Sequence, residues 1–193
     1  MKNLILIALI FVPFITKSQN QIDWDGKYQL QLSDFLSKET QIGNVDIYSL
    51  NTASYIDFFF NMTTGEFMFT KNFNPKVNCS FKRDAAYLIA PDSLTAINLL
   101  NFAQYEFDLS ELYARKFRKN LYENKDAFSD VSFYKPIFDE IMKEYTERHS
   151  KASKETDLGK DKEKLVAFHE EVLKEIQELS YFCKTCKPHK KSK

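Results

Sequence analysis

The stretch KVNCSFK, residues 76–82, decides how the first half of this chain is interpreted. Val77, Cys79 and Phe81 alternate with polar residues, so the apolar side chains recur at every second position. Such a period is typical of a β-strand with one buried face and one face in water. The segment QYEFDL, residues 104–109, has the same alternation. We therefore expect the chain from about residue 24 to residue 109 to form β-strands.

The strands expected from this pattern are short and closely spaced. They lie near residues 26–32, 44–50, 55–62, 66–71, 76–82, 85–90, 95–101 and 103–109. Turn-forming residues such as Thr63-Thr64-Gly65 and Pro91-Asp92-Ser93 separate them. Short connections favour antiparallel pairing, and a long meander hides its edges by closing into a barrel or a sandwich. The expected fold class is α+β, an antiparallel β-meander followed by a C-terminal helical hairpin.

The period changes after Leu109. The apolar residues between Leu109 and Leu121 fall at helical spacing, with Asp108 or Ser110 as a cap, although strands through Tyr113 and Phe117 are an alternative. Residues 136–183 carry two amphipathic patterns, the first starting at a proline and the second following a break at Gly159. We expect a β-rich domain over 19–135, a helical hairpin over 136–183, packed on the sheet or on a partner, and a disordered Lys-rich tail over 184–193.

The N-terminus resembles a secretory signal. Lys2 precedes an apolar run over residues 4–15, and small residues at Thr16 and Ser18 predict cleavage after residue 18. The run is shorter than the ~20 residues that a membrane-spanning helix needs. We therefore expect a secreted or periplasmic protein with no membrane span in the mature chain. Without residues 1–18 the chain carries two fewer lysines and a net charge near −2, which argues against nucleic-acid binding.

Three cysteines are present, and two of them form a Cys183-x-x-Cys186 pair. In an oxidising compartment we expect a structural disulfide, either Cys183–Cys186 or one of these with Cys79, which otherwise is a buried thiol. A thiol-redox pair is one alternative, although the pair follows a predicted helix and does not start one. A zinc site of Cys183, Cys186 and His189, completed by His169 or Cys79, is the other.

The remaining polar residues predict no catalytic set. His149 lies in a polar segment, and His169 lies at the apolar edge of the last helix as a packing residue. No residue pattern specifies a cofactor, and the four glycines build no phosphate-binding loop. The basic cluster Arg115, Lys116, Arg118 and Lys119 is expected to be a solvated helix face. Contact with nucleic acid, an anionic glycan or a lipid surface is the alternative.

The segment 24–30, WDGKYQL, resembles the opening strand of the calycin-type barrels, the lipocalin and fatty-acid-binding group. The likeness covers about 20 residues, through Ser33-Asp34-Phe35. It implies a β-barrel with an interior ligand. The chain then departs from the fatty-acid-binding proteins, which place two helices next. From the residues themselves, Trp24 and Tyr28 are expected to close one end of the meander, with Gly26 in a tight bend.

The aromatic content, 18 Phe and 10 Tyr, shapes the functional expectation. Aromatic rings bury large areas and either fill a core or line a cavity. We expect an exported, non-enzymatic binding or interaction protein that holds a small apolar ligand or a protein partner on its sheet. A periplasmic thiol-redox or metal-binding protein is the alternative. The residues expected to line such a cavity are Tyr55, Phe58, Phe60, Phe67, Phe69, Phe81, Tyr87 and Phe107.

Overall fold

A computed structural model describes residues 20–58 and 61–188 of the chain. The expected signal peptide, residues 1–18, lies outside these residues, as do Phe60 and His189. The strands are β1 (Gln21–Asp23), β2 (Gln41–Ile42), β3 (Ser49–Asn51), β4 (Ser54–Phe58), β5 (Val77–Lys82) and β6 (Tyr87–Ala90). The α-helices are α1 (Thr64–Phe69), α2 (Ser93–Asn124), α3 (Tyr134–Thr156) and α4 (Lys162–Glu178). Short 3₁₀ helices are η1 (Leu32–Asp34), η2 (Asn74–Lys76), η3 (Val131–Phe133) and η4 (Ser180–Phe182).

The fold is α+β, as expected, but the described strands form two small three-stranded sheets and no closed barrel. One sheet has the order β1-β5-β4, and the other has the order β2-β6-β3. β3 and β4 are successive strands of residues 49–58, and β5 and β6 are successive strands of residues 77–90. The antiparallel pair β4–β5 therefore continues into the antiparallel pair β3–β6. They form a long ribbon that is interrupted at Ala53, whose φ of 46° is left-handed. β1 pairs antiparallel with β5, and β2 pairs parallel with β6.

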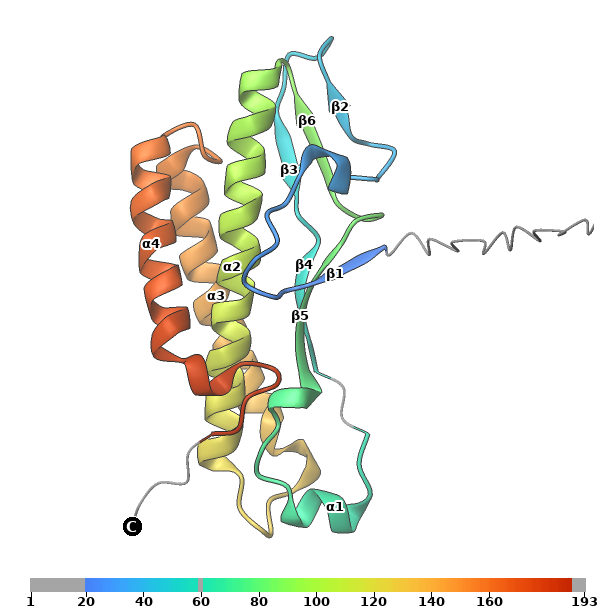
Figure 1. The fold of residues 1–193 in the computed structure, drawn as a ribbon, viewed down its shortest axis with the longest axis vertical. Coiled ribbons are helices and arrows are strands. Elements are labelled where there is room, and N and C mark those ends of the chain that lie inside the picture. Colours follow the sequence, from blue (N-terminus) through green and yellow to red (C-terminus); the bar gives the residue numbers. More distant parts are fainter. Residues whose placement is uncertain (1–19, 59–60, 189–193) are drawn as a thin grey trace, which may run out of the picture.

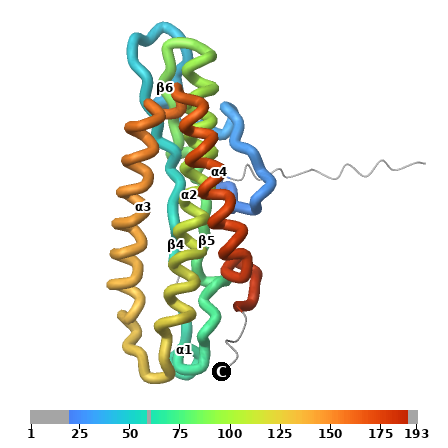
Figure 2. The backbone as a smooth tube through the Cα atoms, turned by 90° about the vertical axis from the view of Figure 1, so that its left-hand side faces the viewer, coloured from blue at the N-terminus to red at the C-terminus, as the bar shows by residue number. Residues whose placement is uncertain are grey.

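The molecule is built around α2. The ribbon lies along one side of this helix, and α3 and α4 lie on the other side (Figure 1). Figure 2 shows α2 running most of the length of an elongated body, with α3 and α4 beside it. The helical hairpin therefore packs on α2 rather than on the sheet, because α2 lies between them.

The prediction of strands over 95–101 and 103–109 is wrong. Both segments belong to α2, a single helix of 32 residues whose cap is Asp92, which accepts a hydrogen bond from the Thr95 amide. A helix at the centre of a fold is buried all round, so its apolar residues do not follow one stripe. Tyr105, Phe107 and Asp108 are all at most 5% exposed, which shows why the alternation carried no strand information there.

Of the other predicted elements, some are confirmed and some are wrong. β5 and β6 lie within the predicted strands 76–82 and 85–90, and β4 lies mostly within 55–62. The predicted strand 66–71 is wrong because these residues form most of α1, which Thr63 caps. The helix from Leu109 onward is confirmed as part of α2, and so are two helices after it, α3 and α4. The predicted strand 26–32 is wrong: this segment is a turn at Gly26 and an extended approach to η1.

Candidate functional site

Three of the aromatic residues expected to line a cavity, Phe67, Phe81 and Phe107, fill the interior instead. Phe81 of β5 and Phe107 of α2 are buried and lie edge to face, with ring centroids 6.0 Å apart. Phe67 of α1 is buried against Phe73 and Phe133, at 6.3 and 5.9 Å. Rings packed at these distances leave no room for a ligand between them.

The other candidate lining residues that the structure describes lie at the edges of this core or outside it. Phe58 is partly buried and contacts the ring of Phe117, 5.2 Å away. Tyr55 and Tyr87 are half-buried, and Lys82 lies over the Tyr55 ring at 4.6 Å. Phe69 points away from the core and is 88% exposed. The structure therefore does not bring these residues together at one site.

The cysteine pair closes a small loop. Cys183 and Cys186 form a disulfide, and Cys79 is a buried free thiol whose pKa is raised by burial. Cys183 directly follows η4, so no helix N-terminus lies at its sulfur to activate it. A disulfide sulfur does not bind zinc as a thiolate does. No group of three metal-binding side chains occurs within residues 20–58 and 61–188.

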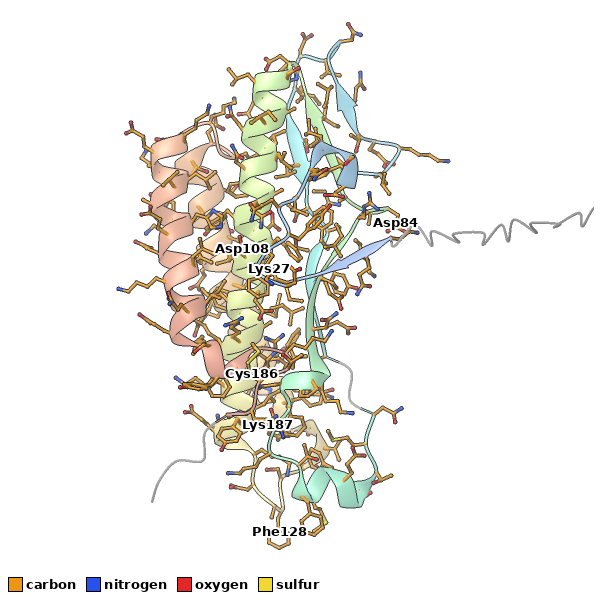
Figure 3. All side chains as sticks on the ribbon, in the orientation of Figure 1. Lys27, Asp84, Asp108, Phe128, Cys186 and Lys187 are labelled. Carbon is orange, nitrogen blue, oxygen red and sulfur yellow. A yellow bond between two sulfur atoms is a disulfide. The ribbon has the colours of Figure 1, made fainter. Side chains whose placement is uncertain are left out.

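Backbone carbonyls of the segment around this disulfide are bound from the protein interior. Asn74 Nδ2 donates to the carbonyls of Tyr181 and Cys186, at 3.1 and 3.0 Å. Arg118 Nη1 donates to the Phe182 carbonyl at 3.0 Å. The segment thus lies against η2 and α2, near the lower end of the ribbon, where Figure 3 labels Cys186.

A row of buried polar residues runs along α2. Its members, spaced four, three, four and three residues apart on one helix face, are Gln104, Asp108, Glu111, Arg115 and Arg118. The expectation that Arg115 and Arg118 point into solvent is wrong, because they are 7% and 0% exposed. The arginines lie inside because the helix that carries them is enclosed by α4, the ribbon and the C-terminal segment.

Glu111 holds both buried arginines. Its Oε1 accepts hydrogen bonds from Arg115 Nε at 2.9 Å and from Arg118 Nη1 at 2.8 Å. The second arginine also donates to the Val77 carbonyl of β5 at 2.9 Å. Arg115 donates to the Ile176 carbonyl of α4 at 2.7 Å. These bonds link α2 to both of its neighbouring layers.

Asp108 is the second carboxylate in this row that accepts several hydrogen bonds, and it lies near the middle of α2 (Figure 3). Its carboxylate accepts Trp24 Nε1 at 2.6 Å, Gln104 Nε2 at 3.1 Å and His169 Nε2 at 2.8 Å. Gln104 Oε1 in turn accepts the Leu30 amide at 2.8 Å. His169 is thus held by a carboxylate rather than packed among apolar groups alone.

A second polar group faces α3. His149 Nε2 lies 3.3 Å from Glu106 Oε2, and Tyr145 donates to the same carboxylate. The hydrogen bond to Glu106 raises the pKa of His149 above its ordinary value. His149 is therefore a partly buried partner of α2, not a free surface residue.

One end of the molecule carries exposed apolar side chains. Phe69 of α1 and Phe128 of the α2–α3 loop are 88% and 91% exposed, and Met68 and Val131 are 37% and 53% exposed. Helix α1 and the connection between α2 and α3 meet at this end, because Phe67 of α1 contacts Phe133 of η3. Figure 3 shows Phe128 at the same end of the molecule. We call Met68, Phe69, Phe128 and Val131 the aromatic end.

Comparison with protein-family models, with curated proteins and with solved structures finds no match. Among the described residues, no helix is both long and apolar enough to cross a membrane.

Sequence reasoning missed the polar row of α2 and the aromatic end. The row does have a signal in the sequence, since polar residues recur at 4-3-4-3 spacing inside a strongly apolar segment. The aromatic end has none, because Phe69 and Phe128 are 59 positions apart and a periodic pattern does not distinguish an outward ring from an inward one.

Proposed function

We propose that this chain is an exported, non-enzymatic interaction protein that docks a protein partner through its aromatic end. The observation that carries the proposal is the near-complete exposure of Phe69 and Phe128. Burial of such a side chain contributes about 1.5–3 kcal/mol. Large exposed apolar groups at one place are typical of an interaction surface.

The platform beneath these rings favours a docking role. Phe67 packs between Phe73 and Phe133, and Lys125 Nζ lies 4.2 Å from the centroid of its ring. A well-packed support fixes the outward rings and lowers the entropy that binding would cost.

The charges around the aromatic end favour a protein over a lipid surface. Glu66, Asp126 and Asp130 are exposed next to the rings in sequence, and Lys71, two positions after Phe69, is exposed as well, so acidic groups outnumber the basic one there. Carboxylates would be repelled by anionic lipid headgroups, which attract basic segments instead. A protein with an apolar recess is the partner that suits this surface.

The disulfide Cys183–Cys186 supports the exported part of the proposal, because disulfides persist in oxidising compartments. The solid aromatic interior supports a surface site over a cavity for a small apolar ligand.

The double variant F69S/F128S tests the proposal. It removes both exposed rings, so the folded protein should keep its thermal midpoint and lose its partner in affinity capture from the exporting host. Loss of two central contacts of this kind weakens binding by at least about 30-fold.

The variant L94S/I97S is the matched control, since Leu94 and Ile97 are 64% and 42% exposed at the N-terminal end of α2. Quantitative mass spectrometry of the captured proteins should show the partner with wild type and with L94S/I97S. Equal capture by F69S/F128S, or loss of capture in L94S/I97S alone, would contradict the proposal.

A further inference from the structure

A groove lies between α2, the first half of α4 and the extended segment before η1. Its volume is about 460 Å³, within the usual range for small-molecule sites. Aliphatic side chains, amides and two basic residues line it: Leu30, Leu100, Leu165, Val166, Gln29, Asn101, Gln104, Lys162 and His169. The groove is far in sequence and structure from the aromatic end, so it is independent of the docking surface proposed above.

The lining has a charge pattern that sets it apart from the other grooves of the molecule. Its charged or protonatable groups are Lys162 and His169, and within the part of the chain that the structure describes no carboxylate lines it. Three other surface grooves are lined by three or four carboxylates each. Lys162 forms no ion pair with a described residue, so its ammonium group is available to an anion.

The hydrogen bonds at the base of the groove leave one ring nitrogen for a ligand. Asp108 is 5% exposed and accepts from His169 Nε2, so Nε2 carries a proton. Both polar atoms of Gln104 are already bonded, to Asp108 and to the Leu30 amide. His169 is 24% exposed in its side chain, and its Nδ1 has no hydrogen-bond partner among residues 20–58 and 61–188.

With Nε2–H donating to Asp108, Nδ1 of the neutral ring accepts a hydrogen bond, and Nδ1 of the doubly protonated ring donates one to a carboxylate. When the ligand arrives as a carboxylic acid, its proton passes to Nδ1, and the resulting carboxylate accepts the Nδ1–H bond. When it arrives as a carboxylate, Nδ1 takes up a proton from solvent as the ligand binds. Both routes give the same complex, in which the imidazolium bridges Asp108 and the ligand.

We propose that this groove binds a small monocarboxylate with an apolar body, its carboxylate between His169 Nδ1 and the Lys162 ammonium and its body on the leucines. The apolar part of the lining requires the hydrocarbon portion, and the absence of a lining carboxylate favours the anion.

Hexanoate is the probe for this site, and hexan-1-ol, of the same chain length without the charge, is its control. Titration of ¹⁵N-labelled full-length protein, followed by NMR, should show saturable shifts of the Leu100, Gln104, Leu165 and His169 amides with hexanoate. Hexan-1-ol should bind more weakly by about tenfold, as expected for loss of a hydrogen bond between charged groups.

Two lysine variants separate the site from general surface charge. K162Q should weaken hexanoate binding about two- to fivefold, as expected for one exposed charge pair. K164Q is the matched control and should leave binding unchanged, because Lys164 is paired with Asp161 at 2.9 Å and does not line the groove. H169A should weaken binding by about tenfold or more.

Lys162 is exposed, so K162Q folds whether or not H169A does. Absence of saturable shifts in these amides, equal affinity for hexanoate and hexan-1-ol, or equal effects of K162Q and K164Q would overturn the proposal.

Discussion

At the scale of single residues, buried polar groups of α2 hold the fold's layers together. Arg118 is fully buried, yet its guanidinium reaches Glu111, the Val77 carbonyl of β5 and the Phe182 carbonyl after η4. Burial of a charge is tolerated only when it is paired and hydrogen-bonded. The residues that fix the relative position of α2, the ribbon and the C-terminal segment are therefore polar ones.

The first prediction concerns this buried pair. Replacement of Glu111 by Ala leaves Arg115 and Arg118 without their shared carboxylate, so we expect a loss of about 3–5 kcal/mol of unfolding free energy. The double variant E111L/R118M should lose less than E111A alone, because it leaves one buried arginine, Arg115, without a carboxylate where E111A leaves two. Urea denaturation measures the unfolding free energy of each variant. A loss in the double variant equal to the summed losses of the single variants E111L and R118M would contradict a direct interaction between Glu111 and Arg118.

The second prediction concerns Gly159, in the turn between α3 and α4. Its φ is +93°, and an added Cβ would lie 2.4 Å from the Asn98 carbonyl oxygen of α2. We expect Gly159→Ala to cost about 2–5 kcal/mol, from the left-handed backbone and the clash together. Gly43→Ala is the control: its φ of +87° is similar, but nothing lies within 4 Å, so only about 1–2 kcal/mol should be lost. Equal losses of unfolding free energy in Gly159→Ala and Gly43→Ala would show that the contact of Gly159 with the Asn98 carbonyl adds nothing to the cost.

The third prediction concerns His149 and Glu106. The pKa of His149 is raised in the folded protein, so the pair stabilises the fold at pH below the unfolded-state pKa. This contribution is lost as the pH rises through the higher folded-state pKa. NMR titration of the His149 ring should give a pKa above the ordinary value, and E106Q should lower this pKa. E106Q should also reduce the change in unfolding free energy with pH between the unfolded-state and folded-state pKa values of His149. An unchanged titration in E106Q would contradict the assignment.

At the scale of elements, the disulfide sits where the chain leaves α4 and returns to the ribbon. The loop it closes is short, so the disulfide restricts the unfolded chain little. The Asn74 and Arg118 hydrogen bonds hold the same segment without it.

The fourth prediction follows from this geometry. The double variant C183S/C186S should stay folded and lose about 2 kcal/mol or less of stability. Thermal unfolding measures this loss, and an insulin-reduction assay of wild type and variant tests the thiol-redox alternative. Reductase activity in wild type that disappears in the variant would favour redox chemistry over a structural role.

At the scale of the whole molecule, one buried apolar cluster extends from Leu30 to Ile176. It includes residues of the ribbon, α2, α3 and α4, and the expected division near residue 135 does not interrupt it. A helix that both layers share should couple their unfolding.

The fifth prediction is therefore a single cooperative transition. Trp24 is the one tryptophan and is bound to Asp108 of α2, so its fluorescence reports the contact between α2 and the segment that directly follows β1. Under non-reducing conditions its unfolding curve should coincide with the helical far-UV circular dichroism curve. Separate midpoints would indicate that α3 and α4 unfold on their own.

The amphipathic segments were predictable from the sequence alone. β5 and β6 each have one side against α2, and α3 and α4 each bury one stripe, so their hydrophobic periods are visible in the residues. The Cys183–Cys186 disulfide is one of the three pairings that three cysteines allow.

The position of α2, and the contacts that depend on it, follow from tertiary packing. A helix that is buried nearly all round, as α2 is between residues 102 and 115, keeps no hydrophobic stripe, so residues 103–109 resemble a strand in sequence. The same enclosure buried Arg115 and Arg118, brought Trp24 and His169 to Asp108, and left Phe69 and Phe128 outside. Local periodicity reports which side of an element is buried, whereas these contacts join residues 41 to 84 positions apart and exist only once the layers have packed.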